Sequence, residues 1–246
     1  MKRLISSELR KLRATPTMWW LLAGTTLLAV AATIGAFVLS NAKDISLTSE
    51  EAIRGDLHAV GSGSILVAIA GIIGMAGEFR FGQSDQTFIS EPRRARVLGV
   101  KLAVFAVLGA LFGVIASLGT LATMWIWITS DGKTVPFGES YIWTTVGGAV
   151  ASASIFGVLG VAIGAVARNQ VVAIVGALGW LIVFEPIVFE ASTEVGQWLP
   201  GAAAQALRQI PQDGLLSTGA GAAIFGVWTI AVLLVGYWRT TRNDLT

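Results

Sequence analysis

The chain of 246 residues contains no cysteine and a single histidine, His58. Without cysteine there can be no disulfide framework, no thiolate metal site and no cysteine nucleophile. With one histidine the chain has no HExxH helix, and no serine–histidine–carboxylate set can form beyond that residue. We therefore expect no catalytic residue and no bound metal, and we assign His58 to a surface or interface position.

Charged residues are also scarce. They make up 13% of the chain, whereas 54% of its residues are hydrophobic. A soluble domain usually carries about 25% charged residues. Because so few charges cannot cover a globule of this size, lipid must surround most of the chain. The sequence predicts an all-α polytopic membrane protein with one transmembrane domain over residues 1–246.

Six apolar stretches are long enough to be transmembrane helices, since about 20 residues cross a bilayer. The spans are predicted at about 18–39, 59–77, 99–128, 141–167, 171–189 and 219–238. The apolar core of a cleaved signal peptide is about 7–15 residues long, so the first stretch is a span. Two spans contain a GxxxG pattern, Gly109 with Gly113 and Gly160 with Gly164, which indicates tight helix packing.

Residues 1–16 precede the first span and are basic. Leu4, Ile5, Leu9 and Leu12 fall on one side of a helix, with Glu8 intruding among them, and the arginines lie opposite. This pattern predicts an amphipathic helix that lies in the membrane interface, with its basic side chains towards anionic headgroups. The alternative is a basic flank with no structure of its own.

The distribution of basic residues predicts the orientation. If the amino terminus is cytoplasmic, thirteen of the 17 Lys and Arg residues lie on the inner side. The outer side then holds Lys43, Arg54, Lys133 and Arg208. Loops rich in Lys and Arg stay in the cytoplasm. We expect a multi-pass protein of the cytoplasmic (plasma) membrane with both termini in the cytoplasm.

The polar stretch between the second and third spans, over about 78–98, carries a dense basic cluster. Gly82 interrupts the chain, residues 83–89 suit a short helix, and Pro92 is placed to start the next one. We predict a helix that docks onto another protein, with apolar anchors supplied by Phe79, Phe81 and Phe88. Glu78 and Arg80 can form ion pairs with a soluble partner or with the amino-terminal helix. The alternative is an ordinary basic loop whose aromatic side chains lie among the headgroups.

Glu185 and Pro186 interrupt the fifth span. An ionisable residue at mid-membrane costs roughly 2.5–3.5 kcal/mol on insertion scales, and Pro186 can break the helix by freeing a backbone carbonyl. Two interpretations of Glu185 stay open: a polar group at the substrate exit or holding the next segment, and an interfacial glutamate that reaches water. In that next segment, Trp198-Leu199-Pro200 followed by GAAAQAL predicts a re-entrant or interfacial helix half-sunk in the outer interface.

Three stretches together resemble the ABC-2 type permeases, which are the membrane subunits of bacterial ABC exporters. They are SELRKLRATPTMWWLL, GEFRFGQSDQTFISEPRRARVLGVK, and VVAIVGALGWLIVFEP followed by WLPGAAAQAL. The resemblance implies a separate ABC ATP-binding subunit that holds ATP and Mg, and a second permease copy or paralogue. It also implies a cytoplasmic coupling helix. The residues expected to couple to the ATPase are Glu78, Phe79, Arg80, Phe81, Gln83, Asp85, Thr87 and Phe88.

On this resemblance the chain forms the path of an amphipathic or hydrophobic substrate, such as a drug, peptide or lipid, with Glu185 and Pro186 on the path or gate. No nucleic-acid partner and no directly bound cofactor are expected. A secondary transporter would need buried acids within its spans, and only Glu185 comes close to that. A membrane anchor or sensor subunit that carries no substrate also stays open. The missing catalytic constellation argues against a membrane enzyme.

Overall fold

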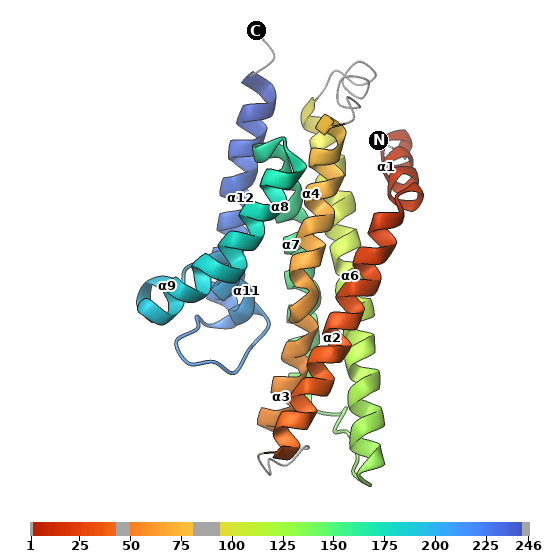
Figure 1. The fold of residues 1–246 in the computed structure, drawn as a ribbon, viewed down its shortest axis with the longest axis vertical. Coiled ribbons are helices and arrows are strands. Elements are labelled where there is room, and N and C mark those ends of the chain that lie inside the picture. The colour runs from red at the N-terminus through yellow and green to blue at the C-terminus, as the bar shows by residue number, and fades with distance from the viewer. Residues whose placement is uncertain (1, 43–49, 81–93, 243–246) are drawn as a thin grey trace.

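The computed structural model describes residues 2–42, 50–80 and 94–242, and the ordered elements of these ranges are all helices (Figure 1). In chain order they are α1 (Lys2–Ala14), α2 (Pro16–Ala42), α3 (Glu50–His58), the 3₁₀ helix η1 (Ala59–Gly63), α4 (Ser64–Arg80), α6 (Arg94–Ser130), α7 (Ser140–Ala167), α8 (Gln170–Leu178), the π-helical turn η2 (Gly179–Phe184), α9 (Glu185–Ala191), α10 (Thr193–Gly196), α11 (Pro200–Leu207) and α12 (Thr218–Arg242). The predicted all-α class is confirmed for the described residues.

Six helical stretches of the described chain are long and apolar enough to cross a membrane, as the sequence predicts. They are Pro16–Leu39, Ile53–Glu78, Ala95–Ser130, Ser140–Ala167, Gln170–Ala191 and Thr218–Arg239. The second begins well before residue 59 because α3 and η1 join α4 without a break. Ile53 and Leu57 lie one turn apart on α3 and are buried against Phe37 and Met124, so α3 belongs to the bundle.

Glycines let the central helices approach closely. α7 packs against α4, α6 and α12. A Cβ on Gly109 of α6 would lie 2.4 Å from the Ala153 carbonyl oxygen, and one on Gly160 of α7 would lie 2.0 Å from the Ala68 carbonyl oxygen. Such distances leave no room for a side chain, so both GxxxG patterns pack helices of this chain against each other.

The fifth stretch leans away from the bundle (Figure 1). In its most apolar 18-residue segment only 17% is buried, whereas 61% is buried in the corresponding segments of the stretches that contain α4 and α7. The helix is not broken at Pro186, because the wider π-helical turn η2 comes immediately before Glu185 and the chain continues as α9. A widened turn accommodates a proline, which has no N–H and crowds the preceding turn.

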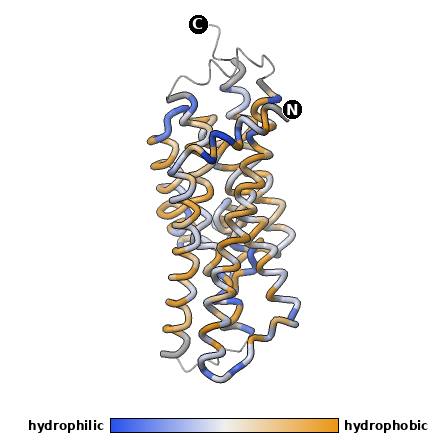
Figure 2. The backbone as a smooth tube through the Cα atoms, turned by 90° about the vertical axis from the view of Figure 1, so that its right-hand side faces the viewer, coloured by the Kyte–Doolittle hydropathy of each residue, from blue (hydrophilic) through white to orange (hydrophobic). Residues whose placement is uncertain are grey.

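The two ends of the bundle are formed by different helices. α1, the end of α4, the start of α6 and the end of α12 lie at one end, which we call the α1 end, and α3 lies at the other, the α3 end (Figure 1). Hydrophobic residues run along the length of the bundle between them (Figure 2). Both extremities of the described chain are therefore on the same side, as six crossings require. α9 and α11 lie short of the α3 end.

Candidate functional site

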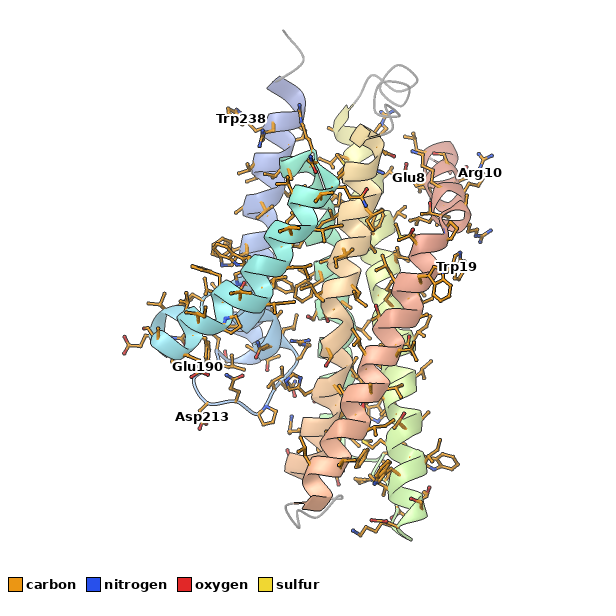
Figure 3. All side chains as sticks on the ribbon, viewed as in Figure 1. Glu8, Arg10, Trp19, Glu190, Asp213 and Trp238 are labelled. Carbon is orange, nitrogen blue, oxygen red and sulfur yellow. The ribbon has the colours of Figure 1, made fainter. Side chains whose placement is uncertain are left out.

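The amino-terminal helix α1 packs against α6 and the start of α2. Its most buried described residue is Glu8, which is 6% exposed, whereas Ile5 and Leu9 are 41% and 44% exposed. Figure 3 shows Glu8 on the side of α1 that faces the bundle and Arg10 on the opposite side. The sequence places Glu8 among the apolar residues on one side of α1 with the arginines opposite, and in the structure Glu8 is turned toward the bundle while Ile5 and Leu9 stay exposed.

Glu8 points inward because it belongs to a cluster of four charges with Lys11, Glu78 and Lys101, of which only the Lys11 side chain is substantially exposed, at 38%. The Lys101 Nζ lies 2.8 Å from Glu8 Oε2 and 2.9 Å from Glu78 Oε1, and it also donates a hydrogen bond of 2.9 Å to the Gly74 carbonyl. The Lys11 Nζ lies 2.8 Å from Glu8 Oε1 and 2.7 Å from Glu78 Oε1. Two ammonium groups and two carboxylates therefore balance, and all three donors of Lys101 have an acceptor.

The charges around α1 favour the ionised forms of Glu8 and Lys11. Burial alone would raise the pKa of Glu8, but the ammonium groups of Lys101 and Lys11 outweigh it and hold that pKa below its usual value of 4.5. Burial alone would lower the pKa of Lys11, but the carboxylates of Glu78 and Glu8 raise it above its usual 10.5. Opposite charges at hydrogen-bond distance favour ionisation on both sides of the pair, so the cluster stays charged at neutral pH.

The four-charge cluster lies at the base of the segment that joins α4 to α6. Glu78 is in the last turn of α4, and Lys101 is in the second turn of α6. α1 is consequently tied by ion pairs to the helices on both sides of residues 81–93. Beside the cluster lies a cavity of about 320 Å³ that reaches Met18 at the start of α2 and Gln170 at the start of α8.

Only some of the predicted coupling residues fall in the described chain. Glu78 pairs with the amino-terminal helix, one of the two partners that the sequence allowed. Phe79 and Arg80 end α4. The remaining five, Phe81, Gln83, Asp85, Thr87 and Phe88, lie outside the described residues.

Sequence reasoning did not assign Glu8, Lys11 and Lys101 to this site. Two signals could have found them. Glu8 interrupts the apolar side of an amphipathic helix, and Lys101 stands inside an otherwise apolar run. A charge in either place requires a partner.

Glu185 occupies a second buried position. It is 5% exposed, and its Oε2 accepts a hydrogen bond of 2.6 Å from the backbone N–H of Gly201, in the first turn of α11. The N–H groups of a first helical turn have no partner within the helix, and the helix dipole favours a carboxylate there. Glu185 therefore does not reach water as an interfacial glutamate would. It fastens α9 to α11.

The other end of α11 is fastened by Arg208. Although the sequence places Arg208 in an outer segment, its side chain is buried at 8% exposure, and burial lowers its pKa to about 10. Its guanidinium lies against Gly61 in η1, where a Cβ would meet Nη1 at 1.5 Å. A cation at the carboxyl end of a helix also interacts favourably with the helix dipole.

Comparisons with protein-family models, with curated proteins and with solved structures found no match to this chain. Within the described residues no three acidic or histidine side chains gather closely enough to hold a metal ion. Two features remain as candidate sites: the four-charge cluster at the α1 end, and the buried carboxylate of Glu185 between α9 and α11.

Proposed function

We propose that this chain is the permease subunit of an ATP-driven ABC-2 type exporter in the cytoplasmic membrane. The observation that carries the proposal is the four-charge cluster, which ties α1 to both sides of residues 81–93. A membrane bundle that contains no motor of its own needs a firm connection to an external one. The six apolar helices supply the bundle, and the sequence resemblance supplies the kind of motor.

Motion passes from the ATPase to the bundle through this connection. A partner that pushes on the segment 81–93 displaces the end of α4 and the start of α6 together, because Glu78 and Lys101 are paired with each other and with α1. Rigid-body displacement of packed helices is an established route for such transitions. In this proposal the α1 end is cytoplasmic, ATP and Mg bind to the partner, and the predicted coupling residues other than Glu78 contact it.

A second permease copy or a paralogue completes the path. Three of the apolar stretches are largely exposed: in the most apolar segment of each, 22% or less is buried. They are the stretches that contain α2, α8 to α9, and α12. Their exposed side chains include Leu27, Val175 and Ile230, which are all apolar. Such apolar faces can contact lipid or the helices of a second permease subunit. A path lined by them suits an amphipathic or hydrophobic substrate, which is the class we propose.

Partner docking tests the proposal. Phe88→Ala should remove an apolar anchor from the contact with the ATPase, and a truncated anchor costs about 2 kcal/mol or more, a loss of about thirtyfold in affinity. The matched control is Phe137→Ala, an exposed phenylalanine near the start of α7 at the α3 end. We expect a copurifying ATPase to be lost with F88A and kept with F137A. Retention with both variants, or no ATPase with the unchanged chain, would contradict the proposal.

A secondary transporter is the second candidate, and one observation favours it. Asp56 is 1% exposed in the second apolar stretch, and neither of its carboxylate oxygens has a hydrogen-bond partner among the described residues. Buried acids within spans are typical of proton- or ion-coupled carriers. Transport into proteoliposomes driven by a proton gradient, without any ATPase, would favour this candidate. An ATPase partner without transport of any substrate would instead indicate an anchor or sensor subunit.

A further inference from the structure

A cavity of about 240 Å³ lies between α9 and α11. Its polar lining includes two carboxylates and two amides, and its apolar lining includes a leucine and a phenylalanine: Glu185, Glu190, Gln205, Gln212, Leu181 and Phe189. No lysine or arginine is among the described residues that line it. The cavity thus combines negative charge with an apolar wall.

The carboxylate of Glu185 is only half satisfied. Its Oε2 is held by the Gly201 N–H, and the Trp180 indole and the Ala202 N–H are also close to the carboxylate. Its Oε1 is buried and has no hydrogen-bond partner among the described residues. A buried charge without a full set of partners is unfavourable, so the site gains stability from any group that supplies a donor and a positive charge.

The chemistry of the lining selects an organic cation. Calcium requires six to eight oxygen ligands and magnesium near-ideal octahedral geometry, and no three acidic or histidine side chains gather here within the described chain. An ammonium group needs fewer acceptors, since it has three donors to place. Glu185 Oε1 is one acceptor, and Glu190 and the amide oxygens of Gln205 and Gln212 are others within the same cavity.

The surroundings of the cavity suit the rest of such a molecule. Phe184 and Ile187 lie within two residues of Glu185 and are 44% and 63% exposed, so the helical stretch that carries Glu185 also exposes apolar side chains. The cavity lies between elements that stop short of the α3 end (Figure 1). Figure 3 shows Glu190 at the far end of α9, on the same side as Asp213 in the segment after α11. An alkyl or aromatic body can therefore remain in the bilayer while its charged end enters the cavity.

We propose that the cavity between α9 and α11 binds the ammonium group of a cationic amphiphile, with Glu185 as its principal acceptor. The inference deepens the proposed function and rests on it, because it names the chemical class of the exported substrate. Glu185 has two tasks in this arrangement. Its Oε2 positions α11, and its Oε1 receives the ligand.

Binding of a matched pair of probes tests the site. Decylammonium and decanol have the same chain and differ in the charged head, and the partition of each into protein-free nanodiscs is subtracted. Their binding is measured by equilibrium dialysis of tritiated probe against the full chain in lipid nanodiscs. We expect the unchanged chain to bind decylammonium at least tenfold more tightly than decanol. Equal affinities for the two probes would overturn the proposal.

Substitutions identify the acceptor. Glu185→Gln keeps an oxygen for the Gly201 N–H but removes the charge, and it should reduce decylammonium affinity at least tenfold while leaving decanol unchanged. The control is Glu194→Gln, which removes an exposed carboxylate from α10 and should change neither affinity. If E185Q fails to fold, Glu190→Gln tests the site instead, because Glu190 is an exposed residue of the cavity lining. This substitution should reduce the affinity for decylammonium at least threefold and leave the affinity for decanol unchanged. An ammonium preference that is unaltered in the folded variants would overturn the proposal.

The assay separates this site from the proposed function because it uses no ATPase. If the chain prefers decylammonium through Glu185 but no ATPase copurifies, the exporter proposal fails and the site stands. If an ATPase copurifies but decylammonium and decanol bind equally, the exporter proposal stands and this substrate class is wrong.

Discussion

Lys101 holds the four-charge cluster together, because it contacts both carboxylates and is itself only 2% exposed. Lys101→Met keeps much of the side-chain volume but leaves Glu8 and Glu78 buried with only Lys11 between them. Removing one partner of a buried ion pair typically costs about 3–5 kcal/mol. We expect K101M to lower the melting temperature in detergent clearly. The control Lys133→Met, at an exposed lysine beyond α6, should leave it within error.

The charge state of Glu8 also predicts how docking of α1 depends on pH. A depressed pKa means that the stabilisation is complete above the ordinary value of 4.5 and is lost as the pH falls through the folded value. For Lys11 the pKa is raised, so its contribution is present below 10.5 and is lost as the pH rises further. α1 should therefore stay docked at neutral pH and detach only below pH 4.5.

Spin labels on single cysteines at Arg10 and Ala95 can follow this detachment, since both positions are exposed and the chain has no other cysteine. The distance distribution should stay narrow from neutral pH to pH 5 and broaden below 4.5. In the Glu8→Gln background it should already be broad at neutral pH. A transition at pH 6, or an E8Q variant that behaves like the parent, would show that the cluster does not hold α1.

At the scale of helices, glycine contacts set how closely α4 and α7 approach. Gly160→Ala would place a Cβ 2.0 Å from the Ala68 carbonyl oxygen, which cannot move unless the helix moves. Overpacking of this kind costs about 1–3 kcal/mol or more. Gly147→Ala lies on the same helix α7, and a Cβ there meets nothing within 4 Å. We expect G160A to lower the melting temperature and G147A to raise it slightly through better helix propensity.

The six apolar helices were predictable because each is a long apolar run, and such runs have one stable form in a bilayer. Glu8 was visible in the sequence as a charge on the apolar side of α1, but its partner was not. Glu8 and Lys101 are 93 residues apart in the chain, so their pairing cannot be seen locally. The same holds for Arg208, which the sequence places on the outer side in residues 190–217 and whose guanidinium is buried against Gly61 in η1.

For Glu185 the sequence identified the residue but left its role open. Its position within an apolar span was the signal. The choice between a carboxylate that reaches water and one that holds the following segment depended on where α11 folds back. That path is set by contacts of α11 with α12 and α7, which join residues far apart in sequence.

At the scale of the whole molecule, the proposed function depends on which end of the bundle faces the cytoplasm. The two ends of α6 provide a matched test, because Ala95 at the α1 end and Ser130 at the α3 end are both exposed on one continuous helix. The chain contains no native cysteine, so single cysteines at these positions can be labelled without background. The excess of Lys and Arg near the α1 end predicts that this end is cytoplasmic.

A membrane-impermeant maleimide should therefore label Ser130→Cys in intact cells and Ala95→Cys only after the membrane is opened. Arg10→Cys on α1 should behave like A95C, since the four-charge cluster keeps α1 at that end. Labelling of A95C from outside, with S130C protected, would invert the protein in the membrane. In that case the segment 81–93 would face away from ATP, and no cytoplasmic ATPase could drive the bundle through it.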